Sequence, residues 1–102
     1  MSFLVTNKLG KKLQKSRDKS LLQKLDIAVN KIEEIFSNNL EYKTNRVTKV
    51  FQDVFVYRID RHLMLIFTSH KLNNDSLNIT ALDIVKHDDI NKALKTYYHY
   101  EN

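Results

Sequence analysis

Three basic side chains, two arginines and a histidine, lie in a largely apolar stretch of the chain, FVYRIDRHLMLIF, at residues 55–67. A strand does not need them to fold, and their types suit chemistry: a guanidinium binds phosphate oxygens in pairs, and an imidazole exchanges a proton near neutral pH. The three residues are Arg58, Arg61 and His62. They predict a site that handles phosphate. The plainer alternative is an exposed sheet face on which Arg58 pairs with Asp60 or Asp83, an interaction worth about 0–1 kcal/mol.

A second candidate pair, Lys86 and His87, follows the last predicted strand. A sheet often presents functional groups where a strand passes into a helix, so His87 can serve there as a general acid or base. An isolated histidine at a strand end is more often structural. The functional interpretation therefore depends on the other basic residues lying close to it.

Other kinds of site find less support in the composition. The single glycine, Gly10, excludes a glycine-rich phosphate loop, and the lack of cysteine excludes a thiolate metal site or a cysteine nucleophile. The four histidines share no metal-ligand spacing with a carboxylate. We therefore expect neither a metal nor a cofactor.

Positive charge is concentrated near the start of the chain, whose net charge is +5. Residues 1–24 hold seven basic side chains against one acidic, a local charge of +6, whereas the rest holds ten basic and eleven acidic, a charge of −1. Such a patch attracts a polyanion or an acidic protein, and it can equally be the solvated face of a helix. Its candidate phosphate-binding residues are Lys8, Lys11, Lys12 and Lys15.

Apolar periodicity predicts that helices come first. A short strand at 3–6 leads to a helix that Asn7 caps and that turns Leu9 and Leu13 inward, with its lysines largely outward. A polar turn at 16–20 follows. The clearest helix comes next and ends at Asn38-Asn39; its apolar stripe is Leu21, Leu25, Ala28, Ile32 and Ile35.

The pattern then changes to that of strands. We expect strands at 46–51, 54–60, 63–67 and 77–85, with a turn at 69–76. In the strand 54–60 the aromatic face should meet the helices, which leaves Arg58 on the open face. Asp88 or Asp89 should cap a last helix, whose stripe is Ile90, Ala93, Leu94 and Tyr97.

The expected fold is thus α+β, with an N-terminal helical hairpin packed on a mostly antiparallel sheet of four or five strands and a short C-terminal helix. The length fits a single domain, 1–102. In the tail at 96–102, one interpretation is that Tyr98, His99 and Tyr100 stack on bases. The other, which we favour, is that Tyr97, with or without Tyr98, completes the helix stripe while the rest frays. No apolar run approaches the ~18 residues that cross a bilayer, and the start is not a signal peptide, so we expect a cytoplasmic protein without membrane contact.

Three motifs, taken in order and spacing, resemble the RelE/ParE superfamily of toxin–antitoxin toxins over residues 3–94. They are VYRI (56–59), HLMLIF (62–67) and ITALDIVKHDDI (79–90). The resemblance implies a RelE-like fold and a partner antitoxin that masks the basic surface. In one branch of the family the toxin is a metal-independent endoribonuclease that cleaves mRNA on the ribosome; in the ParE-like branch it inhibits DNA gyrase without nuclease residues.

For the site residues, the resemblance implies that Arg58 contacts phosphate and that His87, preceded by Lys86, lies at a basic position of the family's site. The arginine that the family uses for the scissile phosphate falls at Met64. Arg61 or His62, just before it, can replace that arginine in a shifted register. A third possibility is a catalytically inactive member that binds only RNA or a protein partner.

Overall fold

A computed structural model gives the arrangement of residues 2–17, 19–72 and 76–98, and within them it contains five strands and three α-helices. A 3-10 turn, η1 (His87–Asp89), links the last strand to the last helix. The elements in chain order are β1 (Ser2–Val5), α1 (Asn7–Lys15), α2 (Ser20–Ser37), β2 (Val47–Phe51), β3 (Val54–Arg58), β4 (Leu63–Lys71), β5 (Leu77–Lys86) and α3 (Ile90–Lys95).

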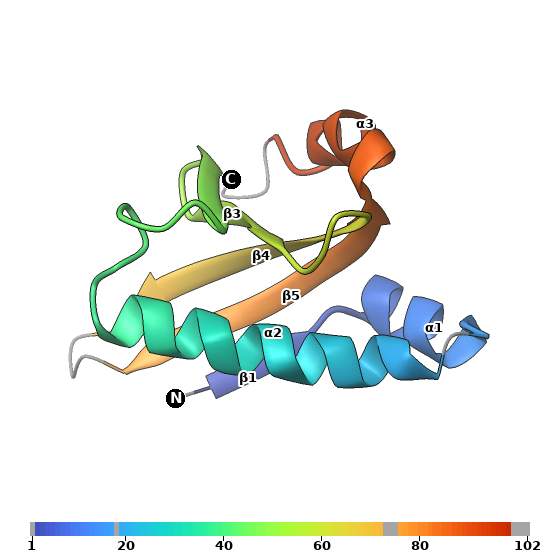
Figure 1. The fold of residues 1–102 in the computed structure, drawn as a ribbon, viewed down its shortest axis with the longest axis horizontal. Coiled ribbons are helices and arrows are strands. Elements are labelled where there is room, and N and C mark those ends of the chain that lie inside the picture. Colours follow the sequence, from blue (N-terminus) through green and yellow to red (C-terminus); the bar gives the residue numbers. More distant parts are fainter. Residues whose placement is uncertain (1, 18, 73–75, 99–102) are drawn as a thin grey trace.

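The strands form one sheet in the order β1-β5-β4-β3-β2 (Figure 1). β1 pairs with β5 in parallel, and the other neighbours are antiparallel. The α+β class with a mostly antiparallel five-stranded sheet is therefore confirmed. Because β3 and β5 run opposite to β4, the end of β3, the start of β4 and the end of β5 meet at the same edge of the sheet.

Helix α2 covers one face of the sheet (Figure 1). Four of the five predicted stripe residues are buried, and Ile35 is half-buried while Val29 and Phe36 are buried beside them. Phe36 packs edge-on against Phe55 and Phe67, with ring centroids 5.2 and 5.9 Å apart. The aromatic side of β3 thus meets α2, as its alternation predicts.

The opposite face of the sheet is not as open as predicted. Val54, Val56, Ile66 and Leu82 form a second apolar cluster there, and the predicted stripe of α3 packs on it together with buried Tyr97. Tyr98 contacts Phe51 edge-on, with ring centroids 5.4 Å apart. Tyr97 therefore completes the stripe of α3, as predicted, while Tyr98 contacts Phe51 and remains 62% exposed. Residues 99–102, where fraying was expected, lie outside the described residues.

Several predicted boundaries are wrong in detail. Thr6, not Asn7, caps α1, because its Oγ1 atom accepts a hydrogen bond from the N–H of Leu9 at 3.3 Å. β3 ends at Arg58, and β4 continues to Lys71 through part of the predicted turn, because its pairing with β5 extends that far. Asp89 occupies the N-cap position of α3 without a side-chain hydrogen bond to it.

The ladder between β4 and β5 contains a β-bulge. Ile66 pairs with Asp83 and Phe67 with Ala81, so Leu82 is the additional residue. Both Leu82 and the neighbouring Asp83 are buried. As for the membrane, none of the helices in the described segments has the length and apolar character needed to cross one.

Candidate functional site

One carboxylate organises the turn between β3 and β4. The Oδ1 atom of Asp60 accepts hydrogen bonds from the backbone N–H groups of His62 and Leu63, at 2.7 and 2.9 Å. The hydrogen bond from His62 lowers the pKa of the Asp60 carboxyl; partial burial opposes this, and the Leu63 hydrogen bond and the charge of Lys24 add to the lowering. The turn presents Arg61 and His62 as exposed side chains at the edge of the sheet.

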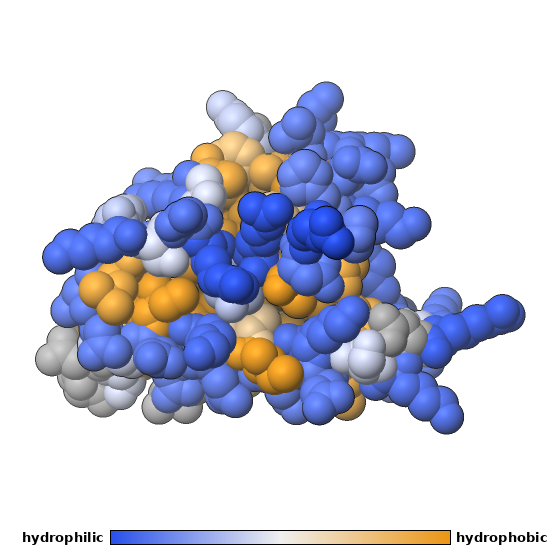
Figure 2. Space-filling model, viewed as in Figure 1, coloured by the Kyte–Doolittle hydropathy of each residue, from blue (hydrophilic) through white to orange (hydrophobic). Residues whose placement is uncertain are grey.

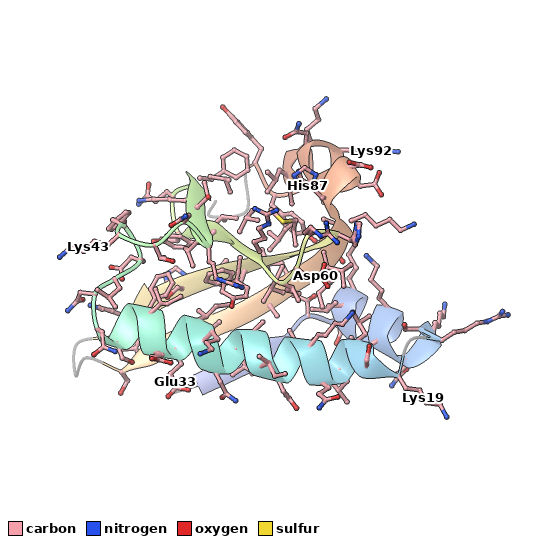
Figure 3. The ribbon with its side chains drawn as sticks, in the orientation of Figure 1. Lys19, Glu33, Lys43, Asp60, His87 and Lys92 are labelled. Carbon is pink, nitrogen blue, oxygen red and sulfur yellow. The ribbon has the colours of Figure 1, made fainter. Side chains whose placement is uncertain are left out.

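The end of β5 lies directly beside this turn. Lys86 pairs with Leu63, and one residue further on the N–H of His87 donates a hydrogen bond to the carbonyl oxygen of His62 at 2.8 Å. Figure 3 shows His87 near the turn that carries Asp60. Two histidines that are 25 positions apart in the sequence thus occupy the same edge of the sheet.

A groove of about 360 Å³, which we name the histidine groove, runs between these two segments. Its only acidic lining residue is Asp88, whose side chain is fully exposed. The Oδ1 atom of Asp88 lies 3.6 Å from Nδ1 of His87. The lining residues are Arg61, His62, Leu63, Lys86, His87 and Asp88. Four of the nine residues predicted for a site therefore come together here: two imidazoles for proton transfer and two permanent cations for phosphate.

Arg58 faces a neighbouring groove of about 490 Å³, which we name the arginine groove. Arg61 lines both grooves and so joins them. Arg58 forms no ion pair with Asp60 or Asp83, which was the plainer alternative for its role. Asp60 pairs instead with Lys24 at 3.7 Å, and Asp83 pairs with lysines of α1. The lining residues of this second groove are Thr44, Asn45, Arg46, Arg58, Ile59, Asp60 and Arg61.

The lysines of α1 divide into two groups. Lys12 and Lys15 line a third groove, of about 530 Å³, whose other wall includes Lys86, so this groove meets the histidine groove at that residue. Lys11 is exposed and Lys8 points to another partner; neither lines any of the three grooves. The structure thus brings Lys12 and Lys15, but not Lys8 and Lys11, to the predicted site.

Lys8 and Lys12 are held by a buried carboxylate. Asp83 is 3% exposed, and its oxygens lie 2.9 Å from Nζ of Lys12 and 3.5 Å from Nζ of Lys8. Lys12 also donates a hydrogen bond to the carbonyl oxygen of Ile84, and Oδ1 of Asp83 accepts one from the N–H of Ile84. These contacts fix α1 to the end of β5, so Lys12 has a structural role that the sequence did not reveal.

Lys8 has a further partner in Tyr97. Its Nζ atom lies 3.4 Å from the Tyr97 hydroxyl oxygen and 5.4 Å from the centre of the ring. Burial lowers the pKa of Lys8, but the hydrogen bond to Tyr97 and the charges of Tyr97 and Asp83 outweigh it, so the pKa lies above its usual value. Lys8 therefore ties α1 to the segment after α3.

Met64 lies directly opposite Arg58 in the ladder between β3 and β4. Its side chain is half-buried against the apolar cluster under α3. The position where the family resemblance expects an arginine is thus occupied by a packed apolar side chain. Within the described residues, the arginines nearest along the chain to this position are Arg61 in the turn and Arg58 in β3.

The roles of three residues of the site region were not predicted. Arg46 was predicted only as the first residue of the strand 46–51, and it immediately precedes β2. Its carbonyl oxygen accepts a hydrogen bond from the N–H of Arg58 at 2.9 Å. Asp60 was predicted only as an ion-pair partner of Arg58, and its role in the turn was missed. An aspartate whose side chain accepts a hydrogen bond from the backbone N–H two residues later is a known turn signal. The role of Asp83 depends on a contact across 71 positions, which no local pattern reveals.

In the part of the chain that the structure describes, no three His, Asp or Glu side chains are grouped as a metal site requires. Comparisons of the chain with models of protein families, with curated proteins and with solved structures find no match in any of the three.

Proposed function

We propose that this chain is a metal-independent endoribonuclease, the toxin of a toxin–antitoxin pair, and that the histidine groove is its active site. The observation that carries the proposal is the 2.8 Å hydrogen bond from the His87 N–H to the His62 carbonyl oxygen. It holds two imidazole-bearing residues in one groove with Arg61 and Lys86. Two proton-transfer groups and two cations are the complement that RNA cleavage without a metal requires.

In the proposed reaction one of the two imidazoles accepts the proton of a ribose 2′-hydroxyl. The 2′-oxygen attacks the adjacent phosphorus, and the other imidazole donates a proton to the 5′-oxygen as the phosphorus–oxygen bond breaks. The products are a 2′,3′-cyclic phosphate and a 5′-hydroxyl end. Arg61 and Lys86 neutralise the charge that builds up on the phosphate oxygens, where one well-placed donor is commonly worth about 3–4 kcal/mol.

The target class follows from the resemblance of the three motifs to RelE-type toxins. We propose mRNA on the ribosome as substrate, in the cytoplasm, and an antitoxin that covers the basic grooves until it is removed. The adjoining grooves support a polyanionic substrate, because a basic residue lies at each junction: Arg61 lines both the arginine and histidine grooves, and Lys86 lines both the histidine groove and the groove beside α1.

Met64 favours a second candidate. A packed apolar side chain opposite Arg58 removes the arginine that family members use for the scissile phosphate, which suits a member that binds its target without cutting it. Such a member acts either as an RNA- or protein-binding module or, in the ParE-like manner, on DNA gyrase. The gyrase alternative predicts growth arrest with intact transcripts and an induced DNA-damage response.

The test is induced expression in cells, with growth and transcript ends followed together. We expect the wild-type chain to stop growth and to create new transcript ends, and His87→Ala to do neither. His70→Ala is the matched control, because His70 is an exposed histidine of β4 outside all three grooves. Growth arrest without new transcript ends contradicts the nuclease proposal and supports the second candidate.

A further inference from the structure

The arginine groove contains two arginines, Arg46 and Arg58, that have no part in the reaction proposed for the histidine groove. The wall of the arginine groove consists of polar residues and three exposed arginines, with Ile59 as its only apolar member. Arg46 enters it from the connection before β2, Arg58 from the end of β3 and Arg61 from the turn. Figure 2 shows the most hydrophilic side chains, in the darkest blue, gathered above α2 in the middle of the visible face.

The positive charge of this groove is not neutralised from within. Its one acidic residue is Asp60, whose Oδ1 atom is occupied by two backbone N–H groups and whose Oδ2 atom lies 3.7 Å from Lys24. Among the described residues, the only side-chain hydrogen bond of the three guanidiniums is a long one, 3.5 Å, from Arg46 to the carbonyl oxygen of Arg58. Three guanidiniums therefore share one groove with no carboxylate committed to them.

An unpaired guanidinium is a two-pronged donor that matches the oxygens of a phosphate. A groove with three of them suits an anion. Ile59 is its single apolar side chain, which favours an anion over a protein segment, because peptide docking usually relies on a buried apolar anchor. Arg61 continues from this groove into the histidine groove, so an occupant with regularly repeated negative charges can follow both. A single-stranded nucleic acid has this character.

We propose that the arginine groove binds the phosphates of the RNA segment next to the linkage held in the histidine groove, with Arg46 as a phosphate-binding residue. The position of this segment beside the cleaved linkage rests on the proposed function, whereas binding of the strand by Arg46 does not. Arg46 is the best test residue because its structural contact with β3 is made by the backbone: its carbonyl oxygen accepts a hydrogen bond from the N–H of Arg58. A change of its side chain therefore leaves that hydrogen bond in place.

The experiment uses a fluorescent 2′-O-methyl RNA hexanucleotide, which lacks the nucleophilic hydroxyl and cannot be cleaved. Its affinity for the purified full chain is measured by anisotropy at several salt concentrations. We expect Arg46→Ala to weaken binding about 5- to 10-fold and to reduce the salt dependence of log K by about 0.7, the value of one lost contact to a single-stranded phosphate. Arg46→Lys should keep the salt dependence and lose part of the affinity, since a lysine binds phosphate only as a point charge.

The control is Lys43→Ala, which also removes one positive charge from the connection before β2 but lies outside the groove (Figure 3). It should change affinity less than 2-fold. The inference is overturned if the wild-type chain does not bind the hexanucleotide, if Arg46→Ala equals Lys43→Ala, or if an acidic peptide of equal charge binds as tightly with the same response to Arg46→Ala. Because the probe cannot be cut, failure of the nuclease proposal leaves this result unaffected, and each proposal fails separately.

Discussion

The backbone N–H of His87 donates a hydrogen bond to the carbonyl oxygen of His62 at 2.8 Å. This contact joins the last residue before the β4 strand proper to the first residue after β5, so both histidines stand at the edge of the sheet where those strands meet. The ladder between β4 and β5 brings the backbones of the two histidines together, and the turn held by Asp60 adds to the positioning of His62. Substitution of either side chain removes no atom of the backbone hydrogen bond.

Asp60 should control how well the turn holds Arg61 and His62. Asp60→Asn keeps the shape of the side chain but weakens the hydrogen bonds to the N–H groups of His62 and Leu63. We expect a loss of about 0.5 kcal/mol in the free energy of unfolding, at the low end for such bonds because the side chain is 40% exposed. Urea denaturation at pH 7 measures it, and Asp26→Asn on the exposed face of α2 is the control.

The same residue gives a pH dependence. The pKa of Asp60 is lowered in the folded chain, so its stabilising effect is fully present above the ordinary aspartate pKa of 3.8 and is lost as the pH falls through the lower, folded value. The difference in stability between the wild type and Asp60→Asn should therefore be constant near neutral pH and shrink in acid. A difference that grows as the pH falls from 5 to 3 is the opposite result.

Lys12 should matter more for folding than for binding. Lys12→Met leaves the buried carboxylate of Asp83 with the more distant Lys8 as its cationic partner, beside the N–H of Ile84, and the partly exposed position of Lys12 moderates the cost. We expect about 2 kcal/mol of destabilisation, below the 3–5 kcal/mol typical of a fully buried pair. Lys11→Met, which removes an exposed lysine of the same helix, should cost less than about 0.5 kcal/mol.

The double variant Lys12→Met with Asp83→Leu separates charge from packing. It removes the uncompensated carboxylate, so it should be more stable than Lys12→Met alone, as measured by urea denaturation. A double variant that is the less stable of the two contradicts the role assigned to this ion pair.

Sequence patterns sufficed where the cause is local. The 3.6-residue period of α2 and the alternation of β3 each follow from the need to bury one side of an element, and both were predicted. The bulge at Leu82 depends on pairing between strand residues 14 to 17 positions apart, and the Lys12–Asp83 contact joins residues 71 positions apart. No local rule encodes either feature. Packing of α3 over Val54 and Val56 likewise depends on where the chain returns, which is why that face was wrongly expected to be open.

The candidate site divides in the same way. Residue type selected Arg61 and His62, whereas the place after the last predicted strand and the family resemblance selected Lys86 and His87. The antiparallel pairing of β4 with β5 brings the four residues together. Arg46 was missed because it opens the predicted strand 46–51, and nothing in that alternating pattern indicates that the chain brings it beside Arg58. Lys8 and Lys12 were predicted to bind phosphate, but both contact the buried carboxylate of Asp83. This partner is more than 70 positions away in the sequence, so no local pattern indicates it.

Met64 offers a test of whether the missing arginine limits the reaction. Met64→Arg introduces a guanidinium directly opposite Arg58, on the same side of the sheet. We expect RNA cleavage to rise about 10-fold, a part of the 3–4 kcal/mol that such a donor commonly supplies. Loss of the packed side chain should cost about 1–2 kcal/mol of stability. Initial cleavage rates and urea denaturation measure the two effects.

The conservative variant Met64→Leu is the control, since it keeps the apolar packing and adds no charge. It should leave both the cleavage rate and the stability close to those of the wild type. An unchanged or lower rate in a folded Met64→Arg variant indicates that Arg61 and Lys86 already supply the charge the reaction needs.

The most direct measurement is cleavage of a defined mRNA in a reconstituted translation system, with the chemistry of the new ends determined. The account predicts 2′,3′-cyclic phosphate and 5′-hydroxyl ends with the wild type and with His70→Asn. It predicts a 100-fold or greater loss with His62→Asn and with His87→Asn, in line with the roughly 10²–10⁴-fold contribution of a general acid or base. Equal cleavage by the folded double variant His62→Asn/His87→Asn, or no cleavage by the wild type, contradicts it.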